Sequence, residues 1–379
     1  MKILFAAGGT GGHINPALAA AGDIRERFPD VEILFVGTKN KMEAKLVPAA
    51  GFAFETIDID GFYRQLTLEN IKRDIATLFK LLRASSQAKK ILRAFRPDAV
   101  VGFGGYVSGP VVRMAAKLGI PTAIHEQNAY PGVTNKALAR RVDLVMLNVE
   151  KAGSLLKAKH SPAVTGLPVR GEMLRADREI SRAELGVRDD QTLVLSMGGS
   201  LGAQTINDAV VRLISDHWKE TDLYFLHAAG QYGDWVPEKL RENGVALESA
   251  KNVEIRPYIS DMDRCMAAAD LVICRAGASS LSELEALGKA SILIPSPNVA
   301  ENHQYHNAMA LVEQDAALLL EEKQYSPETM EALFTGVVRN KAKLRTLGEN
   351  AKKLGVPDAK RRIADLILDL ARSKESSAT

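Results

Sequence analysis

A short apolar strand that runs directly into a glycine loop occurs twice in this chain of 379 residues. The first copy covers residues 3–7, followed by Gly8-Gly9-Thr10-Gly11-Gly12-His13; the second covers residues 193–197, followed by Gly198-Gly199-Ser200. A tight glycine turn between a strand and a helix presents free backbone N–H groups and the positive helix end, which suits a phosphate or a polar transition state. Two such units predict two similar α/β domains, an arrangement that suits an enzyme joining two substrates.

The bulk properties restrict the class of protein. The length favours two domains, and 46% hydrophobic with 25% charged residues is enough for ordinary globular cores. The net charge of +3 gives no general attraction for nucleic acid, so we expect no such partner. Cys265 and Cys274 fit neither a disulfide framework nor a metal site, which indicates a reducing compartment. With no signal peptide and no apolar run of roughly 18 residues, we expect a soluble or membrane-surface protein.

Strands and helices alternate along the whole chain, which predicts parallel sheets with ligands beyond the carboxyl ends of the strands. The apolar spacing from residue 14 to 28 predicts a helix, and residues 358–372 predict another. Pro162, Gly166 and Pro168 interrupt an apolar stretch and predict a hinge near residues 161–170. The predicted strands are residues 2–7, 32–36, 99–102, 122–125 and 144–147 in the first half, and 192–197, 223–228, 253–255, 271–274 and 291–294 in the second.

The first glycine loop is not a known nucleotide-binding fingerprint. It lacks the G-x-G-x-x-G spacing, and no P-loop sequence occurs in the chain. A plain strand-to-helix turn is one interpretation, but so many small residues before His13 indicate close approach of a ligand to the backbone. At a helix start, His13 fits either a general base, because imidazole titrates near neutral pH, or a helix-capping group.

Two more clusters follow predicted strands of the first half. Residues 102–110 hold four glycines within eight residues and predict a second wall of the site. His125, Glu126, Gln127 and Asn128 follow an apolar run, and four polar side chains together favour a site over simple loop hydrogen bonding.

The second half carries the features of a nucleotide-sugar site. Gly198 to Ala203 would hold a diphosphate through backbone N–H groups and the Ser200 hydroxyl, unless Ser200 only caps a helix. Ser280 and Glu283 have the spacing of a capping box, but a glutamate at this point can also bind a ribose diol. Gln304 follows Pro295 and Pro297 and fits sugar hydroxyls. No Asp-x-Asp pair lies at a strand end in a setting suited to Mg²⁺, since Asp58-Ile59-Asp60 and Asp261-Met262-Asp263 occur in other contexts, so we expect no essential metal.

A basic helix is predicted at residues 68–95. Residues 64–96 hold nine lysines and arginines against Glu69 and Asp74, while Ile71, Ile75, Leu78 and Leu82 form an apolar stripe. The helix is either a solvated element with one core face or a patch attracted to anionic lipid, with each basic residue contributing about 1 kcal/mol near the surface.

Taken in order, these motifs resemble the MurG family of lipid-linked N-acetylglucosaminyltransferases of peptidoglycan synthesis. The resemblance is carried by GGTGGHINPALA, GFGGYVSGP, HEQN, LPVR, GGSLGA, CRAGASSLSE and NHQYHNA. It implies a GT-B fold of two Rossmann-like domains facing across a cleft, with a C-terminal helix returning to the first domain. It also implies an N-terminal acceptor domain at 1–163, a nucleotide-sugar domain at 164–347 and a terminal helix region at 348–379.

The activity implied is metal-independent and inverting, with no cofactor. N-acetylglucosamine would pass from uridine diphosphate (UDP) to the 4-hydroxyl of an undecaprenyl-diphosphate-linked N-acetylmuramoyl pentapeptide, at the cytoplasmic face of the membrane. Such an enzyme serves cell-wall growth, cell shape and division.

The resemblance assigns roles to matching positions. Thr10, Gly11, Gly12 and Asn128 would approach the sugar and the acceptor, and Arg170 and Ser200 the donor diphosphate. Ile259 would read uracil through its backbone, and Gln304 would bind the donor sugar. Phosphate and ribose would contact Ala278, Ser279, Ser280, Leu281, Ser282 and Glu283. The remaining matched positions are His13 and Glu126, as first and second choice of base, with Tyr106, His125, Asn207 and Asn307.

The sequence departs from the family pattern at three places: Leu167, Leu201 and the segment containing Asn40.

Three other functions remain open. A different sugar transferase of the same fold would use a non-muramoyl acceptor. A sugar-nucleotide epimerase would need paired carboxylates at the anomeric centre, and we find no such pair. A nucleotide-sugar sensor would bind the donor without releasing UDP.

Overall fold

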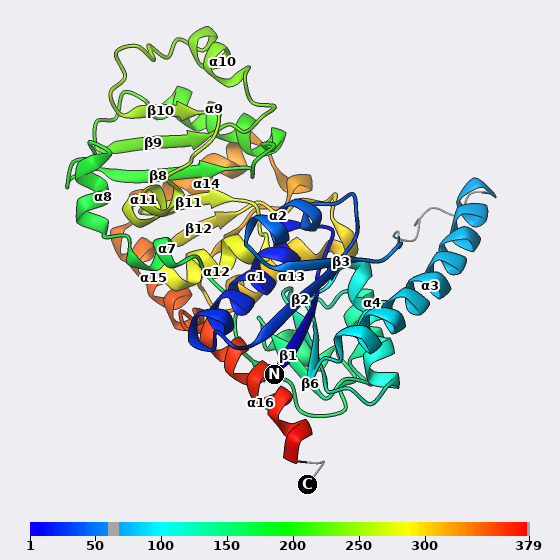
Figure 1. The fold of residues 1–379 in the computed structure, drawn as a ribbon. Helices are drawn as coiled ribbons and strands as arrows, with labels where there is room; N and C mark the ends of the chain where they lie inside the picture. Colours follow the sequence, from blue (N-terminus) through cyan, green and yellow to red (C-terminus); the bar gives the residue numbers. More distant parts are fainter. Residues whose placement is uncertain (60–67, 377–379) are drawn as a thin grey trace. The chain divides into compact units, whose positions relative to one another are not determined.

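The computed structural model describes the backbone of residues 1–59 and 68–376 and the side chains of residues 1–59 and 80–373. It divides the chain into two compact units, shown in Figure 1. The first comprises Met1–Pro168 together with Asp358–Thr379, and the second is Val169–Pro357. The division lies a few residues beyond the boundary expected at 163, and it falls within the stretch in which a hinge was predicted.

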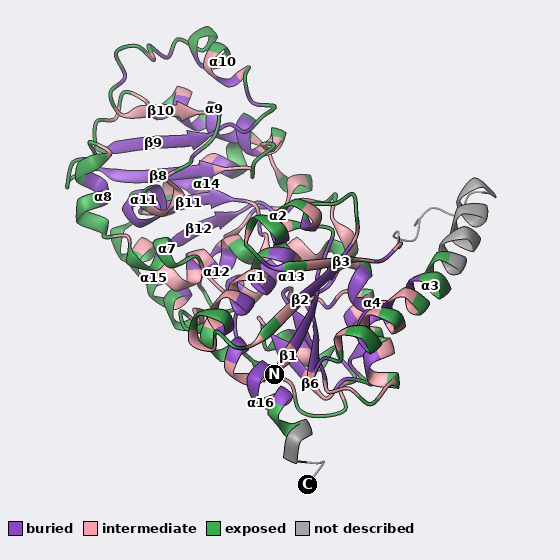
Figure 2. Cartoon of the chain, in the orientation of Figure 1, coloured by how far each residue is buried: buried purple, intermediate pink, exposed green. Residues whose placement is uncertain are grey.

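The first unit is built on a seven-stranded parallel sheet of order β3-β2-β1-β4-β5-β6-β7. Each internal strand is buried on both faces, and Figure 2 shows the strands in the colour of buried residues. The strand order reverses between β1 and β4, the position at which doubly wound sheets bind ligands. The strands are β1 (Lys2–Ala6), β2 (Glu32–Gly37), β3 (Ala53–Thr56), β4 (Ala99–Gly102), β5 (Thr122–Glu126), β6 (Leu144–Leu147) and β7 (Ala163–Val164).

Helices connect these strands, and one returns from the far end of the sequence. They are α1 (Gly11–Arg27), α2 (Glu43–Ala49), α3 (Leu68–Phe95), α4 (Gly105–Lys117), α5 (Val133–Leu138), α6 (Lys151–Ser154) and α16 (Ala359–Ser376). The last of them, α16, inserts Ile363, Ile367 and Leu368 into the same core as Ile14 and Ile24 of α1. Arg27 on α1 also pairs with Asp365 at 2.6 Å. The predicted return of the C-terminal helix is therefore observed, although the helix begins at Ala359.

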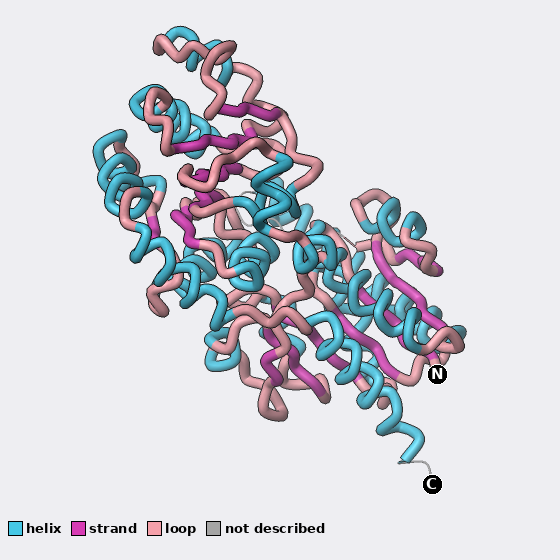
Figure 3. Tube along the Cα trace, turned by 90° about the vertical axis from the view of Figure 1, so that its left-hand side faces the viewer, coloured by secondary structure: helices cyan, strands magenta, loops and turns pink. Residues whose placement is uncertain are grey.

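The second unit repeats this plan with a six-stranded sheet of order β10-β9-β8-β11-β12-β13. Figure 3 shows the alternation of helices and strands along the trace of each unit. The strands are β8 (Thr192–Met197), β9 (Leu223–Ala228), β10 (Val253–Arg256), β11 (Leu271–Cys274), β12 (Ala290–Leu293) and β13 (Leu318–Leu319). The helices are α7 (Gly171–Arg175), α8 (Arg178–Glu184), α9 (Gln204–His217), α10 (Val236–Glu242), α11 (Met262–Ala268), α12 (Ala278–Leu287), α13 (His303–Val312), α14 (Pro327–Val338) and α15 (Lys341–Leu354), with short 3-10 turns at Ala300–Asn302 and Glu322–Gln324.

All ten predicted strands are present, with ends shifted by at most one residue. The strands that the sequence did not predict are β3, β7 and β13, which lie at the edges of the sheets. Edge strands are short and only half-buried, so they lack the continuous apolar run by which a central parallel strand is identified.

Helix α3 differs from its prediction in the part whose side chains are described. Its buried face consists of Ala84, Ala88 and Leu92, at helical spacing, whereas Leu82 is 64% exposed. Assigning Leu82 to the core stripe was therefore wrong, because the buried face lies about half a turn further on. Ile71, Ile75 and Leu78 lie outside the described side chains.

Within the described residues, no helix has the length and apolarity needed to cross a bilayer.

A histidine is buried in the core of the second unit. His227 on β9 lies opposite Ser196 on β8, and 2.8 Å separates its Nδ1 from the Ser196 Oγ. Its Nε2 is buried with no hydrogen-bond partner among the described residues. Burial lowers the pKa of His227 to about 4, against the smaller opposing effect of the Ser196 hydrogen bond.

This histidine makes the stability of the second unit sensitive to acid. An unfolded histidine binds a proton below about pH 6.5, whereas His227 in the folded unit stays neutral until about pH 4. We expect its contribution to lower the free energy of unfolding by about 2 kcal/mol between pH 7 and pH 5, measured by chemical denaturation. Replacing both partners, with Ser196→Ala and His227→Leu, should remove that part of the pH dependence. The exposed His160→Leu variant serves as control, and an unchanged slope in the double variant would contradict the assignment.

Candidate functional site

The first glycine loop connects β1 to α1 at the carboxyl edge of the first sheet. Helix α1 begins at Gly11, so Gly11, Gly12 and His13 form its first turn, and Thr10 is its N-cap residue. The Thr10 side chain makes no cap hydrogen bond, and the first turn contains no acidic residue. The amino end of α1 therefore has no capping or acidic side chain within its own cap and first turn.

His13 is held by its own loop. The Nδ1 atom lies 3.2 Å from the Gly8 carbonyl oxygen and 3.2 Å from the Thr10 Oγ1. A carbonyl oxygen can only accept, so the first contact requires a proton on Nδ1. In the neutral ring this places the lone pair on Nε2, the tautomer that a general base at this position needs.

The loop after β4 packs directly against this histidine. A Cβ at Gly104, where φ is +101°, would lie 2.6 Å from the His13 Cδ2. At Gly105 a Cβ would collide with the Gly8 carbonyl oxygen. Ser108, fully buried on α4, accepts from the Gly104 N–H at 3.0 Å and donates to carbonyl oxygens of the same region. Glycine is thus required because two backbone segments meet around the His13 ring, next to Tyr106, which is 52% exposed.

Glu43 is a member of this site that sequence reasoning missed. Its carboxylate is fully buried and accepts from the Gly9 N–H at 3.0 Å, the Thr38 N–H at 3.0 Å and the Thr38 hydroxyl at 2.7 Å. It occupies the space left by two glycines, since a Cβ at Gly8 would lie 2.6 Å from its Oε1 and one at Gly37 would lie 2.5 Å from its Cγ. Glu43 therefore ties the loop after β2 to the glycine loop. Nothing in the local sequence distinguishes it from a surface glutamate of a short helix.

His125 supports the site from inside the protein. It is completely buried and stacks on Phe103, and its Nε2 lies 3.0 Å from the Gly166 carbonyl oxygen. Burial lowers the pKa of His125 to about 4, so the ring is neutral at physiological pH. Gln127 then links the same histidine to the loop after β4, by donating to the Phe103 carbonyl oxygen at 2.8 Å. With no exposed atom, His125 orders these loops rather than offering a surface for substrate.

Glu126, the second candidate base, is saturated with hydrogen bonds. Its two oxygens accept from Asn128 N–H at 3.0 Å, Gly132 N–H at 3.1 Å and Asn135 Nδ2 at 2.8 Å, and the Asn128 amide adds a longer contact at 3.4 Å. The carboxylate is buried. Accepting a proton from a substrate would require one of these bonds to break, so the geometry favours a positioning role and leaves His13 as the better candidate.

The second glycine loop connects β8 to α9 at the carboxyl edge of the other sheet. Gly202 and Gly230 lie in two loops that are in direct contact. A Cβ at Gly202 would collide with the backbone of Ala229, and a Cβ at Gly230 would collide with the backbone of Gly202. The Ser200 and Leu201 carbonyl oxygens accept from Gln231 and Tyr232, both at 3.1 Å. These bonds fix the loop while the exposed Ser200 side chain has no recorded partner among the described residues.

Two helices of this unit begin at adjacent strand ends without a capping side chain. Helix α9 has Ala203 as its N-cap residue and α12 has Gly277, and neither first turn contains an acidic residue. Helices α8, α14 and α15 of the same unit are instead capped by Asp177, Ser326 and Asn340. Ser280 and Glu283 are not a capping box, because α12 already begins at Ala278. The open helix ends follow β8 and β11, where the strand order reverses, and form a ready anion site.

Glu283 and Arg170 form an ion pair beside α12. The Arg170 Nε donates to the Glu283 Oε1 at 3.1 Å, and the arginine is half exposed. Burial raises the pKa of Glu283, and the Arg170 charge opposes this shift. The Arg170 Nη1 also lies 3.7 Å from the Glu172 Oε1, so the guanidinium is held between two carboxylates. Ala278, Ser279 and Ser280 lie at the open end of the helix, whereas Leu281 and Ser282 are buried.

The remaining predicted residues of the second unit are Ile259, Gln304, Asn207 and Asn307, and three of them bind loop backbone. Ile259 follows β10 and is buried, and its backbone makes no hydrogen bond within the described residues. Gln304 accepts from the Ser296 N–H at 2.9 Å. Asn207 and Asn307 are buried and donate to the carbonyl oxygens of Ala229 and Ala276 at 2.9 Å and 3.2 Å. Both asparagines hold loop backbone and do not face solvent.

The positions that depart from the family pattern cause no conflict in the structure. Leu167 is buried, whereas Leu201 is exposed and its backbone alone makes the loop contact. Asn40 lies exposed after β2, beside the loop that Glu43 secures. Across the described residues, no group of three or more histidine, cysteine, aspartate or glutamate side chains is placed to hold a metal ion.

Comparison with known proteins gives the family. Residues 3–147 match the glycosyltransferase family 28 N-terminal domain, and residues 193–363 match the C-terminal domain of that family. A protein of Acetivibrio thermocellus named UDP-N-acetylglucosamine--N-acetylmuramyl-(pentapeptide) pyrophosphoryl-undecaprenol N-acetylglucosamine transferase is 44% identical over 376 residues, covering 99% of each chain. A protein of the same name from Desulforamulus reducens is 43% identical and covers 97% of each chain.

A solved structure agrees with these relatives. The crystal structure of Acinetobacter baumannii MurG superposes with a TM-score of 0.78 at 30% identity, covering 97% of this chain and 99% of that one. The chain belongs to glycosyltransferase family 28 and, within it, to the MurG family. The resemblance read from the sequence motifs and the two-domain α/β fold of the GT-B class are thereby confirmed.

Glu43→Gln tests whether the buried carboxylate secures the glycine loop. A glutamine offers one acceptor oxygen in place of two, so either the Gly9 or the Thr38 N–H loses its partner. We expect a loss of about 1–3 kcal/mol in the free energy of unfolding, measured by chemical denaturation. Hydrogen exchange should also become faster in the peptide covering residues 8–13. The exposed Glu55→Gln in the same unit is the matched control, and equal behaviour of the two variants would disprove the role.

Proposed function

We propose that this chain transfers N-acetylglucosamine from UDP to the 4-hydroxyl of a lipid-linked N-acetylmuramoyl pentapeptide. The observation that carries the proposal is the pair of uncapped helix ends, α9 and α12, beside the ion pair of Arg170 and Glu283. This arrangement suits a nucleoside diphosphate, with the open helix ends for phosphate and the carboxylate for ribose hydroxyls. The names of the relatives identify both substrates of those proteins, and the similarity extends along the whole chain.

In the proposed division of work, the second unit binds the donor and the first unit the acceptor. Ile259 would offer backbone groups to uracil, and Gln304 would bind the donor sugar. In the first unit, Thr10, Gly11, Gly12, Tyr106 and Asn128 would approach the acceptor, with His13 as the base. Asn207, Asn307, His125 and Glu126 would act indirectly, by holding the loops that carry these contacts.

The reaction is proposed as a single displacement with inversion at the anomeric carbon. The acceptor 4-hydroxyl oxygen forms the new bond to that carbon while the bond to the diphosphate oxygen breaks. The hydroxyl proton passes to the His13 Nε2, and the electron pair of the broken bond leaves with UDP. Charge that grows on the diphosphate would be stabilised by the α9 amino end, the Ser200 hydroxyl and Arg170.

We further propose that the enzyme acts at the cytoplasmic face of the membrane, which it contacts through α3. Leu82 is 64% exposed, and it lies on the same helix as Lys90 and Arg93, whose side chains are exposed. An exposed leucine among cations suits the interface of an anionic bilayer, where apolar contact and charge attraction act together.

A transfer assay tests the proposed reaction. Labelled UDP-N-acetylglucosamine is mixed with the lipid-linked muramoyl pentapeptide in the presence of a chelator. Label in the lipid product together with released UDP is the expected result and would also establish metal independence. If the donor binds but no label moves to this acceptor, the proposal fails and a different transferase or a sensor is favoured.

His13→Ala should lower kcat in this assay by about 10²–10⁴-fold, because the acceptor hydroxyl loses its proton acceptor. Donor binding should stay unchanged, since no donor contact is proposed for His13. The exposed His160→Ala is the control for an unrelated histidine of the same unit. A decrease of less than about tenfold would exclude His13 as the base.

Leu82→Ser should weaken binding to anionic vesicles, measured by co-sedimentation at low salt, because it removes an apolar side chain from the proposed interface. Added salt should release the wild-type protein by screening the basic residues. Ile180→Ser, an exposed apolar position of the second unit, should leave binding unchanged. Equal binding by both variants, or no response to lipid charge, would refute the membrane contact.

A further inference from the structure

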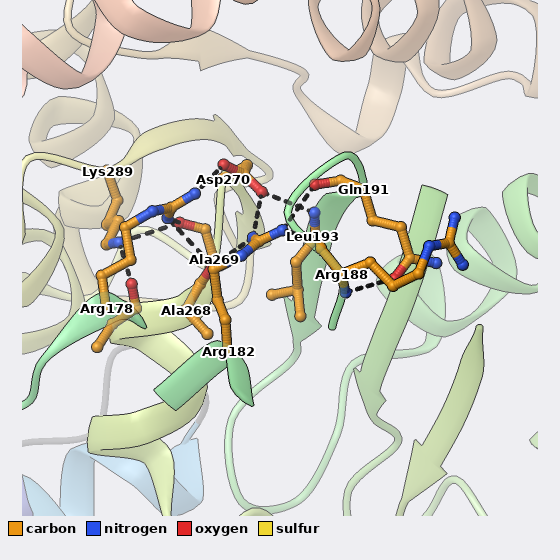
Figure 4. Close-up of polar contacts among 10 residues, drawn as sticks. Arg178, Arg182, Arg188, Gln191, Leu193, Ala268, Ala269, Asp270 and Lys289 are labelled. Atoms are coloured by element: carbon orange, nitrogen blue, oxygen red, sulfur yellow. Dashed lines mark hydrogen bonds and ion pairs between the residues drawn. The ribbon is translucent and has the colours of Figure 1, made fainter. Parts of the chain in front are cut away.

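The second unit contains a pocket that the proposed reaction does not use. It has a volume of about 540 Å³ and lies at the amino ends of β8, β11 and β12, at the edge of the sheet opposite the glycine loop. Figure 4 shows the polar cluster that includes Arg178, Gln191, Asp270 and Lys289 of its lining. Its charged lining consists of five cations, Arg178, Lys289, Lys341, Arg345 and Lys352, against three carboxylates, Asp189, Asp270 and Glu349.

Lys289 lies at the inner end of this pocket and is only 8% exposed. Its Nζ donates to the carbonyl oxygens of Ala267 at 2.7 Å and Ala269 at 3.0 Å. An ammonium group has three N–H donors, so one remains beyond these two bonds. Burial lowers the pKa of Lys289 to about 7, with a further lowering by Arg178 and an opposing effect of Asp270.

The carboxylate closest to this lysine is already committed elsewhere. Asp270 pairs with Arg178 and, at 3.0 Å, with Arg182, and it accepts from the Leu193 N–H at 2.8 Å. No ion pair of Lys289 is recorded within the described residues. Arg178 and Arg182 therefore share a single carboxylate, and Lys289, which is only partly charged at neutral pH, has no carboxylate partner among the described residues.

Two lysines lie at the rim of the pocket. Lys341 and Lys352 on α15 are exposed and form no ion pair in the part of the chain that the structure describes, although the charge of Lys341 acts on the carboxylate of Asp190. Flexible lysines around a buried ammonium form a funnel for an anion, since a charged cleft with low-dielectric walls concentrates the field. The volume lies within the range of small-molecule pockets.

We propose that this pocket is a second anion site, which binds a small multiply charged oxyanion of the phosphate-ester or diphosphate class. Lys289 would donate its remaining N–H to the anion, and Lys341 and Lys352 would close around it. All residues of the site belong to the second unit and lie apart from the nucleotide loops. The inference therefore does not depend on the proposed function.

The alternative is that the cluster only completes the carboxyl end of α11. The carbonyl oxygens of Ala267, Ala268 and Ala269 accept from Lys289, Arg178 and Arg182, and cations at a helix carboxyl end are stabilising in themselves. That role explains the buried part of the cluster. It does not explain why two further lysines lie at the rim, or the open volume beside them.

Isothermal titration of inorganic pyrophosphate into the full-length protein, with UDP at saturating concentration, tests the proposal. We expect one equivalent to bind while UDP occupies the nucleotide loops. The double variant Lys341→Ala with Lys352→Ala should weaken that binding by about tenfold, and Lys289→Met should abolish it. Lys343→Ala, on the same helix but outside the pocket lining, should bind as the wild type does.

Lys289→Met leaves two carbonyl oxygens without a donor and can lower stability. The decisive comparison is therefore between the double variant Lys341→Ala with Lys352→Ala and the control Lys343→Ala. Unfolding measurements on each variant separate a loss of fold from a loss of binding. Absence of binding in the presence of UDP, or equal affinity of the rim double variant and Lys343→Ala, would overturn the proposal and leave the cluster as a helix cap alone.

Discussion

The candidate site depends on close contact between backbone segments at the carboxyl edges of the two sheets. In the first unit, the Gly8 carbonyl oxygen lies where a side chain at Gly105 would be, and the same carbonyl orients His13. In the second unit, Gly202 and Gly230 meet with equally little space between them. Glycine allows main chains to approach until their own polar groups line the site. Any larger residue would separate the loops and displace the groups that they carry.

Buried polar side chains hold these glycine-rich segments in place. Glu43 binds the amides of two different loops, and Glu126 accepts four hydrogen bonds from the segment that follows it. Asn207 and Asn307 each fix one loop carbonyl. A loop rich in glycine has much conformational entropy to lose, so it stays ordered only where such groups offset that loss. The side chains with the greatest influence on the site are therefore mostly inside the protein.

The central strands and both glycine loops could be predicted from the sequence, because strands buried on both faces form unbroken apolar runs and glycines mark the turns. The edge strand β3 has no such signal. The helix that begins at Gly11 was expected to begin at Ile14, since glycines in a first turn do not resemble a helix. Glu43 and Ser108 could not be found, because their partners Gly9 and Ala6 come from distant positions. Likewise, the spacing of Ser280 and Glu283 fitted both a capping box and a ribose-binding glutamate. Only the start of α12 at Ala278 excludes the capping box.

The return of α16 to the first unit has a consequence for biosynthesis. The second unit is one continuous segment, so it can complete its core as soon as residue 357 has left the ribosome. The strands of the first unit precede the second unit in the chain, yet the side chains of Ile363, Ile367 and Leu368 that fill its core are synthesised after the whole of the second unit. On a translating ribosome, the first unit therefore finishes folding after the second. Until α16 has emerged, α1 presents an uncovered apolar surface.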